Sequence, residues 1–289
     1  MAKVLITGIA GGFGKPTALA LLAKGHSVAG SVRSVAGRNA ATVAELEAAG
    51  ARIVEMDVTD TPSTESSVAQ AIAALEGLDV IFNNAGIGSY GIQELMSPED
   101  MARVFDVNVM GVQRVMRAVL PHMRAQGRGT VLYTSSLIGR IATPFYGTYS
   151  ASKWALEAIV ECYRTELSGF GIESCIIEPG AMPTAFFDGM VAPNDQQREA
   201  GYGDFAQVPA MSAAGLAQML EATPNQRPER IAEAMSALLD MPFGKKPFRT
   251  VVDHTGVGPH IERYNDVLHD VTRTVCTNFG IAQMLDLNA

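Results

Sequence analysis

The sequence predicts an α/β fold, a doubly wound parallel sheet of about seven strands with helices on both faces. Short apolar segments alternate along the chain with longer segments whose apolar residues recur at helical spacing. The strand-like segments are apolar throughout, as expected for strands buried on both faces. Of the 289 residues, 47% are hydrophobic and 18% charged, enough for one large core, so we expect a single domain over residues 1–289.

The individual elements follow from this alternation. Strands are predicted, in order, at Val4–Ile6, Ser27–Val32, Arg52–Met56, Asp79–Phe82, Thr130–Thr134, Ser174–Ile177 and Phe248–Val252. Helices are predicted between and after them, at Lys15–Lys24, Ala40–Ala49, Glu65–Leu75, Glu99–Arg124, Tyr149–Phe170, Met211–Ala222, Pro228–Leu239 and Pro259–Phe279. Pro16 suits a first helical turn and Gly25 a helix end, while Ser97 followed by acidic residues is typical of a helix start.

Two segments depart from the regular pattern. Residues 185–225 carry several prolines and glycines, which favours an inserted substrate-binding loop or lid over a second domain. Residues 253–289 form a C-terminal extension beyond the last predicted strand.

Composition excludes several classes of protein. The net charge of -8 is spread along the chain, which argues against a nucleic-acid partner. No stretch of about 18 apolar residues indicates a membrane span, and the N-terminus lacks a signal-peptide pattern, so we expect a cytoplasmic protein. The three cysteines and five histidines show no disulfide or metal-ligand spacing, and no metal is expected.

The turn after the first strand is rich in glycine. It reads Thr7-Gly8-Ile9-Ala10-Gly11-Gly12-Phe13-Gly14. Glycines between a strand and a helix N-terminus let the backbone approach a pyrophosphate, whose charge the helix end favours. The spacing differs from Gly-x-Gly-x-x-Gly, so the turn alone is a weak signal.

A tyrosine and a lysine share one face of a predicted helix. Tyr149 and Lys153 are four residues apart, and an ammonium beside a phenol favours the phenolate, which a tyrosine needs in order to exchange protons near neutrality. Ser136 follows a predicted strand, where open α/β sheets bind ligands. Asn108 lies inside an apolar helical pattern, an unfavourable place that calls for a local partner or a role in a site.

Taken together, these residues resemble the short-chain dehydrogenase/reductase family in its single-domain, Rossmann-type form. The resemblance covers residues 3–184 and continues more loosely to the end. It is carried by Thr7-Gly8-x3-Gly12-x-Gly14, Asp57-Val58, Asn83-Asn84-Ala85-Gly86, Asn108, Ser136, Tyr149-x3-Lys153 and Pro179-Gly180-x3-Thr184.

The resemblance implies an oxidoreductase that moves a hydride between a nicotinamide and a carbonyl or alcohol. It assigns four catalytic residues. Tyr149 exchanges the proton, Ser136 binds the reacting oxygen, Lys153 lowers the Tyr149 pKa and holds the nicotinamide ribose, and Asn108 binds a water that links Lys153 to solvent. The implied cofactor site comprises Gly8, Gly12, Phe13, Gly14, Arg33, Asp57, Val58, Asn84, Ala85, Gly86, Tyr149, Lys153, Pro179, Gly180 and Thr184.

The second strand favours NADP over NAD. Members of the family that use NAD place an acid at its end to bind the ribose 2′-hydroxyl. Here Val32 takes that position and Arg33 follows, and a guanidinium suits a 2′-phosphate. Alternatively, Arg33 only stacks on the adenine.

The substrate is expected to be an apolar or aromatic ketone, aldehyde or secondary alcohol. The resemblance places five apolar residues at the pocket, with core packing as the alternative: Leu137, Phe145, Phe186, Phe187 and Met190. It also implies a homodimer or homotetramer.

Other functions remain open. One is an NAD-linked hydroxysteroid- or dihydrodiol-type alcohol dehydrogenase, and another is a regulator that senses NADP without turnover. A nucleotide-sugar epimerase shares the general fold but usually has a different glycine spacing.

Overall fold

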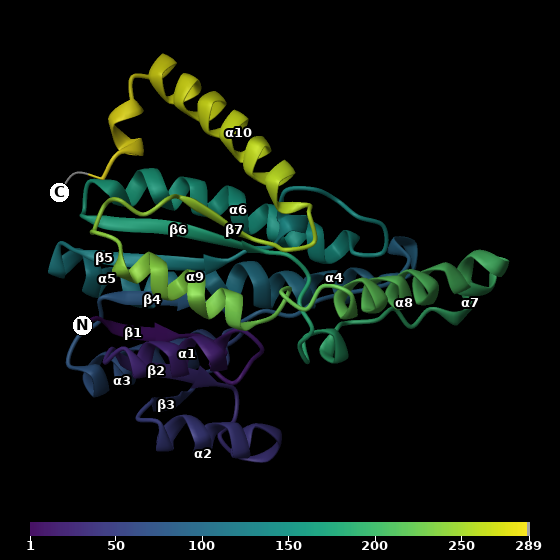
Figure 1. The fold of residues 1–289 in the computed structure, drawn as a ribbon, viewed down its shortest axis with the longest axis horizontal. Helices are drawn as coiled ribbons and strands as arrows, with labels where there is room; N and C mark the ends of the chain where they lie inside the picture. The colour runs from purple at the N-terminus through teal and green to yellow at the C-terminus, as the bar shows by residue number, and fades with distance from the viewer. Residues whose placement is uncertain (288–289) are drawn as a thin grey trace.

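Seven apolar segments form one parallel sheet in the computed structural model, which describes residues 1–287 (Figure 1). Neighbouring strands follow the order β3-β2-β1-β4-β5-β6-β7, and every pairing is parallel. The strands are β1 (Lys3–Ile6), β2 (Ser27–Val32), β3 (Arg52–Glu55), β4 (Val80–Asn83), β5 (Gly129–Thr134), β6 (Ile172–Pro179) and β7 (Arg249–Val252). The predicted fold class is confirmed.

Helices cover both faces of this sheet. One face packs against α1 (Gly14–Ala23), α2 (Ala40–Ala48) and α9 (Glu229–Asp240). The other face packs against α3 (Thr61–Leu75), α5 (Gly111–Gln126) and α6 (Gly147–Ser168). Burial on both faces explains why the strand segments read as continuous apolar runs.

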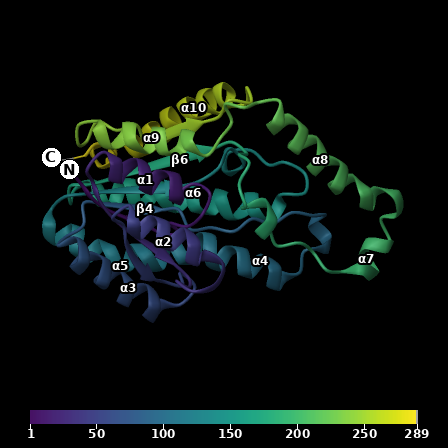
Figure 2. The same ribbon diagram turned by 60° about the horizontal axis from the view of Figure 1, so that its bottom comes forward.

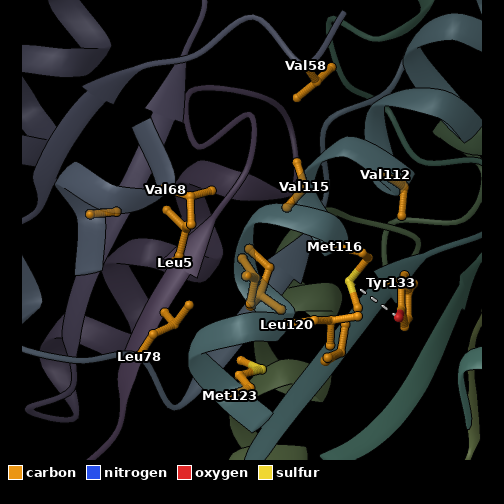
Figure 3. Close-up of a cluster of buried hydrophobic side chains, with 14 of the residues drawn as sticks. Leu5, Val58, Val68, Leu78, Val112, Val115, Met116, Leu120, Met123 and Tyr133 are labelled. Atoms are coloured by element: carbon orange, nitrogen blue, oxygen red, sulfur yellow. Dashed lines mark hydrogen bonds between the residues drawn. The ribbon is translucent and has the colours of Figure 1, made fainter. Parts of the chain in front are cut away.

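Alternate residues of a strand serve the two cores. In β1, Val4 and Ile6 belong to the cluster under α1, α2 and α9, whereas Leu5 belongs to the opposite cluster. Figure 3 shows this second cluster, in which Leu5 and Val68 lie on one side of α5 and Tyr133 on the other. The Tyr133 hydroxyl lies 3.5 Å from the Met116 sulfur and donates to it, so this buried polar atom has a partner.

Most predicted helices begin and end within three residues of the observed bounds, and two of them differ more. The third helix begins at Thr61 instead of Glu65, because the Asp60 side chain accepts a hydrogen bond from Ser63 N and caps the helix. The helix predicted at 99–124 is divided into α4 (Pro98–Phe105), one π-helical turn (Asp106–Met110) and α5. Ser97 forms the expected cap of α4 with Asp100.

The segment at 185–225 stands away from the sheet. It contains α7 (Gln196–Ala200) and α8 (Val208–Glu221), which project from the body of the molecule in both views (Figures 1 and 2). No residue of α8 is buried within the described chain. The helix is therefore held mainly at its ends.

The C-terminal helix α10 (Gly258–Asn278) follows β7. Residues 288 and 289, the end of the predicted extension 253–289, lie outside the described residues. None of the helices within residues 1–287 combines the length and hydrophobicity needed to cross a lipid bilayer.

Candidate active site

The glycine turn after β1 is fixed to the turn after β4. The Asn84 amide donates to Thr7 O at 3.0 Å and to Gly8 O at 3.2 Å. In return, the Thr7 hydroxyl accepts from Asn84 N at 2.9 Å and Ala85 N at 3.0 Å. Gly8 has a φ of 67°, a left-handed conformation that favours glycine. Parallel strands end at the same edge of the sheet, and these bonds hold two of the resulting turns side by side.

Two glycines of the predicted site, Gly12 and Gly86, leave little or no room for a β-carbon. A β-carbon on Gly12 would lie 2.6 Å from Thr184 Cβ, and one on Gly86 would lie 3.2 Å from Asn108 Oδ1. The Gly12 backbone therefore borders the loop after β6. Phe13 directly precedes α1, so the helix begins immediately after the glycine turn. A narrow, donor-rich backbone cradle of this kind fits the pyrophosphate of a dinucleotide.

The carboxyl ends of β2 and β3 bring Arg33 near Asp57. Burial opposes ionisation of Asp57, but hydrogen bonds from Thr59 and the charges of Arg33 and Arg114 lower its pKa overall. Arg33 is exposed, whereas Val58 is buried beside the aspartate. The predicted contacts for adenosine and a 2′-phosphate therefore lie at one edge of the sheet.

The remaining predicted cofactor residues come from the end of β6. Pro179 and Gly180 are buried, and Gly180 N donates to Val252 O at 3.0 Å. Thr184 lies over Gly12, as described above. The loop after β6 thus lies against the glycine turn at the predicted cofactor site.

Tyr149 and Lys153 lie one turn apart on α6, and both are buried. The Lys153 ammonium donates to Thr134 O at 2.7 Å and lies 5.7 Å from the centre of the Tyr149 ring. Ser136, which follows β5, lies near enough to the Tyr149 hydroxyl to oppose the effect of burial on the Tyr149 pKa. Three of the four predicted catalytic residues are thus brought together where β5 meets α6.

Burial controls the protonation of this group. It raises the pKa of Tyr149, although Ser136 opposes the rise. It also lowers the pKa of Lys153 to about 8, against the opposing charge of Glu157. The sequence suggests a lysine that lowers the tyrosine pKa, whereas in the structure burial outweighs that effect. The phenol is therefore kept protonated at neutral pH, which suits it to donate a proton.

Asn108 has partners that the sequence did not reveal. It lies in the π-helical turn, where its amide donates to Ile87 O at 2.9 Å and Ser152 Oγ at 3.0 Å, and its oxygen accepts from Ile87 N. Ser152 in turn donates to Tyr149 O at 2.7 Å. Asn108 is thereby connected to the backbone of the catalytic tyrosine, and π-helical turns often occur at functional sites.

Aromatic side chains extend from Tyr149 into the neighbouring loops. The Phe186 ring lies 5.5 Å from the Tyr149 ring and 5.9 Å from the Phe187 ring. Phe145 lies 6.0 Å from Tyr90 and has a φ of 69°, a strained conformation for a bulky residue. The other two predicted pocket residues also lie nearby: Leu137 directly follows Ser136, and Met190 lies with Phe186 against Gly88.

Sequence reasoning missed several neighbours of this site. Tyr90, Tyr146 and Phe205 extend the aromatic group, with Phe205 6.2 Å from Phe145 and Tyr146 4.7 Å from Tyr90. The Tyr90 hydroxyl also donates to Pro209 O at 2.7 Å, which joins the first turn of α8 to the site. No spacing rule connects these positions, because they come from loops that meet only in the folded chain.

Comparison with known proteins gives a family match. The profile described as short chain dehydrogenase matches residues 2–195. A relative named 3-ketodihydrosphingosine reductase, from Bacteroides thetaiotaomicron, is 38% identical over 185 residues. The aligned region is 64% of this chain and 65% of that reductase, so the chain matches just under two thirds of the relative's length.

Two solved structures show the same fold. A short-chain dehydrogenase from Streptomyces avermitilis is 28% identical, with a TM-score of 0.75 over 97% of this chain and 98% of that one. An alcohol dehydrogenase from Thermococcus sibiricus, solved with 5-hydroxy-NADP, is 27% identical, with a TM-score of 0.68 over 86% of this chain and 95% of that one.

Proposed function

This chain belongs to the short-chain dehydrogenase family, whose members are oxidoreductases acting on CH–OH groups, and on that premise we propose that it is an NADP-dependent carbonyl reductase or alcohol dehydrogenase. The observation that carries this proposal is the grouping of the buried Tyr149 and Lys153 with the partly buried Ser136 at the carboxyl edge of the sheet. The glycine cradle beside it fits a dinucleotide.

A bound nicotinamide supplies or accepts the hydride at the substrate carbon. In the reductive direction, Ser136 holds the carbonyl oxygen by a hydrogen bond and Tyr149 transfers its phenolic proton to that oxygen, so a C–H and an O–H bond form as the carbonyl π bond breaks. Burial keeps the Tyr149 proton in place until the oxygen becomes basic. Lys153 then carries positive charge next to the phenolate that is left.

We propose an apolar substrate. Phe186 packs beside Tyr149 and Phe187 packs against Phe186, while Phe145 belongs to the neighbouring aromatic group with Tyr90 and Phe205. The relative from Bacteroides carries the name of a reductase for a long-chain ketone, which agrees with these aromatic rings. The segment at 185–225 supplies three of these rings, so we assign it to substrate binding. As in other members of the family, we expect a homodimer or homotetramer.

The coenzyme preference is tested by calorimetric binding of NADPH and NADH to the wild type and Arg33→Ala. Loss of one charged contact to the 2′-phosphate should weaken NADPH binding about tenfold or more and leave NADH binding unchanged. Arg52→Ala is the matched control, because Arg52 begins the neighbouring strand β3 and lies at the end of the sheet away from Arg33. Equal affinity of the wild type for both coenzymes would favour the NAD-linked alternative.

Turnover is tested by Tyr149→Phe. The substitution keeps the ring and removes the proton, so the reduction rate should fall about 100-fold or more while NADPH affinity stays near that of wild type. Unchanged turnover would refute the proposed mechanism. A wild type that binds NADPH but reduces none of a panel of apolar ketones would favour a regulator.

A further inference from the structure

A group of buried charges lies along α6 beyond the catalytic lysine. Glu157, which is 2% exposed, is paired with Arg249 at 3.0 Å and with Arg140 at 3.7 Å. We call the whole group the buried ionic cluster, and it comprises Arg140, Glu157, Glu161, Glu178, Arg249 and Asn265. The proposed reaction assigns these residues no role.

Glu157 lies one helical turn beyond Lys153 on α6. Tyr149, Lys153 and Glu157 are spaced four residues apart, so their side chains lie in one row along the helix. We propose that Glu157 is a positioning residue whose negative charge keeps Lys153 protonated beside Tyr149 and the bound nicotinamide. This inference rests on the proposed function for the role of Lys153.

The charge of Lys153 needs such support. Its side chain is 4% exposed, and its ammonium has one hydrogen bond, to the neutral carbonyl oxygen of Thr134. Burial of an ammonium without an opposite charge is strongly unfavourable. Burial lowers the pKa of Lys153 to about 8, and Glu157 acts in the opposite direction. Without Glu157, the lysine would lose its proton nearer to neutral pH.

Among the described residues 1–287, the other elements around Lys153 offer no comparable carboxylate. Strand β5 and the loop after it contribute Thr134, Ser135 and Ser136, and the π-helical turn contributes the Asn108 amide near Gly86, all uncharged. The ionisable neighbour on the same helix is Tyr149, and burial raises its pKa so that it is neutral.

Two arginines lie on the far side of Glu157. Arg140 and Arg249 pair with its carboxylate at 3.7 Å and 3.0 Å. Glu178 faces the same arginines, and burial raises its pKa to about 8, so it titrates in the same range as Lys153. A test must therefore separate the lysine from Glu178.

The test measures the protonation of Lys153 directly. Lysine is labelled with nitrogen-15 in the cofactor-free protein, and the Lys153 signal is identified by its loss in Lys153→Met. In Glu157→Gln its titration midpoint should fall by about one pH unit or more. Calorimetry should show NADPH affinity declining at a correspondingly lower pH, because the ammonium is lost earlier.

Glu161→Gln is the matched control. Glu161 also pairs with Arg249 but lies one turn further along α6 and is 26% exposed. Removal of the Glu161 charge should leave the Lys153 titration midpoint within about 0.3 pH units of wild type, because a more distant, partly exposed charge acts weakly on a buried ammonium. A midpoint in Glu157→Gln equal to that of wild type would overturn the proposal.

Arg249→Gln provides a test of opposite sign. Loss of this positive charge strengthens the field of Glu157 at the lysine, so the Lys153 midpoint should rise. A loosened core would move the Lys153 midpoint in the same direction in both variants. A midpoint in Arg249→Gln that fell or stayed at the wild-type value would overturn the proposal, even if Glu157→Gln failed to fold. The Lys153 titration is measured without cofactor. Its outcome therefore does not depend on whether the wild type binds NADPH or turns over a substrate, and failure of this inference can be distinguished from failure of the proposed function.

Discussion

Thr184 lies directly over Gly12, so close that a β-carbon on the glycine would come within 2.6 Å of the threonine Cβ and Cγ2. The two residues belong to turns that follow β1 and β6, on opposite sides of the centre of the sheet. Their contact brings the loop after β6 against the glycine turn of the predicted cofactor site.

This contact makes the cofactor site sensitive to one methyl group. We predict that Gly12→Ala displaces Thr184 and weakens NADPH binding about tenfold or more, because the backbone no longer fits the pyrophosphate. Calorimetric titration measures the effect. Gly189→Ala is the control, since a β-carbon there meets no atom within 4 Å. Equal affinity in the two variants would show that the cofactor does not bind against Gly12.

The strained backbone at Phe145 predicts that glycine is more stable than alanine at this position. Its φ of 69° disfavours any residue with a β-carbon. Phe145→Gly should therefore be about 1 kcal/mol more stable than Phe145→Ala, although glycine usually destabilises. Denaturant unfolding of the two variants measures the difference. Both should reduce apolar ketones more slowly than wild type, and a more stable alanine variant would contradict the strained conformation.

Ser152 connects Asn108 to the catalytic tyrosine, so its hydroxyl should matter for turnover. Ser152→Ala removes one acceptor from the Asn108 amide and one donor to Tyr149 O. Loss of one such bond is worth about 1 kcal/mol, so kcat should fall about fivefold in steady-state assays.

A neighbouring serine provides the control for that experiment. Ser150 is also buried in α6, and its hydroxyl has no hydrogen-bond partner among residues 1–287. Ser150→Ala should leave both kcat and the unfolding midpoint near wild type. A larger loss of kcat in Ser150→Ala than in Ser152→Ala would refute the role given to the Asn108 connection.

Asn265 attaches the C-terminal helix to the buried ionic cluster. Its amide donates to Glu178 at 2.6 Å, and its oxygen accepts from Arg140 Nε at 3.0 Å. Asn265→Leu leaves both charged groups short of a partner and should lower the free energy of unfolding by about 2–3 kcal/mol. Chemical denaturation measures it, with Asn278→Leu at the exposed end of α10 as control. Equal stability of the two variants would exclude this attachment.

Much of the scaffold could be predicted from sequence. The apolar runs located every strand within a few residues, because burial on both faces leaves a clear local pattern. The boundary at Thr61 was missed because the cap depends on Asp60, a residue outside the apolar pattern. The π-helical turn at 106–110 was missed because it preserves the overall direction of the helix.

The neighbours of the candidate site were harder to predict. Tyr149 and Lys153 stand one turn apart, so their spacing is visible in the chain. Arg140 and Asn265 are separated by 125 positions, and only the folded chain shows that they are paired. A charged residue in a loop segment gives no sign that it will be buried, since burial of charge depends on partners from other elements.

The exposure of helix α8 determines which amino-acid substitutions this protein can tolerate. The matched family region, residues 2–195, ends where α7 begins. The part that follows includes a helix with no buried residue in the described chain, so its side chains contribute little to folding of the sheet. Substitutions there can accumulate without unfolding the enzyme, while the first turn of α8 remains bonded to Tyr90. We therefore propose that substitutions in this helix can change which substrates bind while the sheet and the residues at its carboxyl edge stay folded.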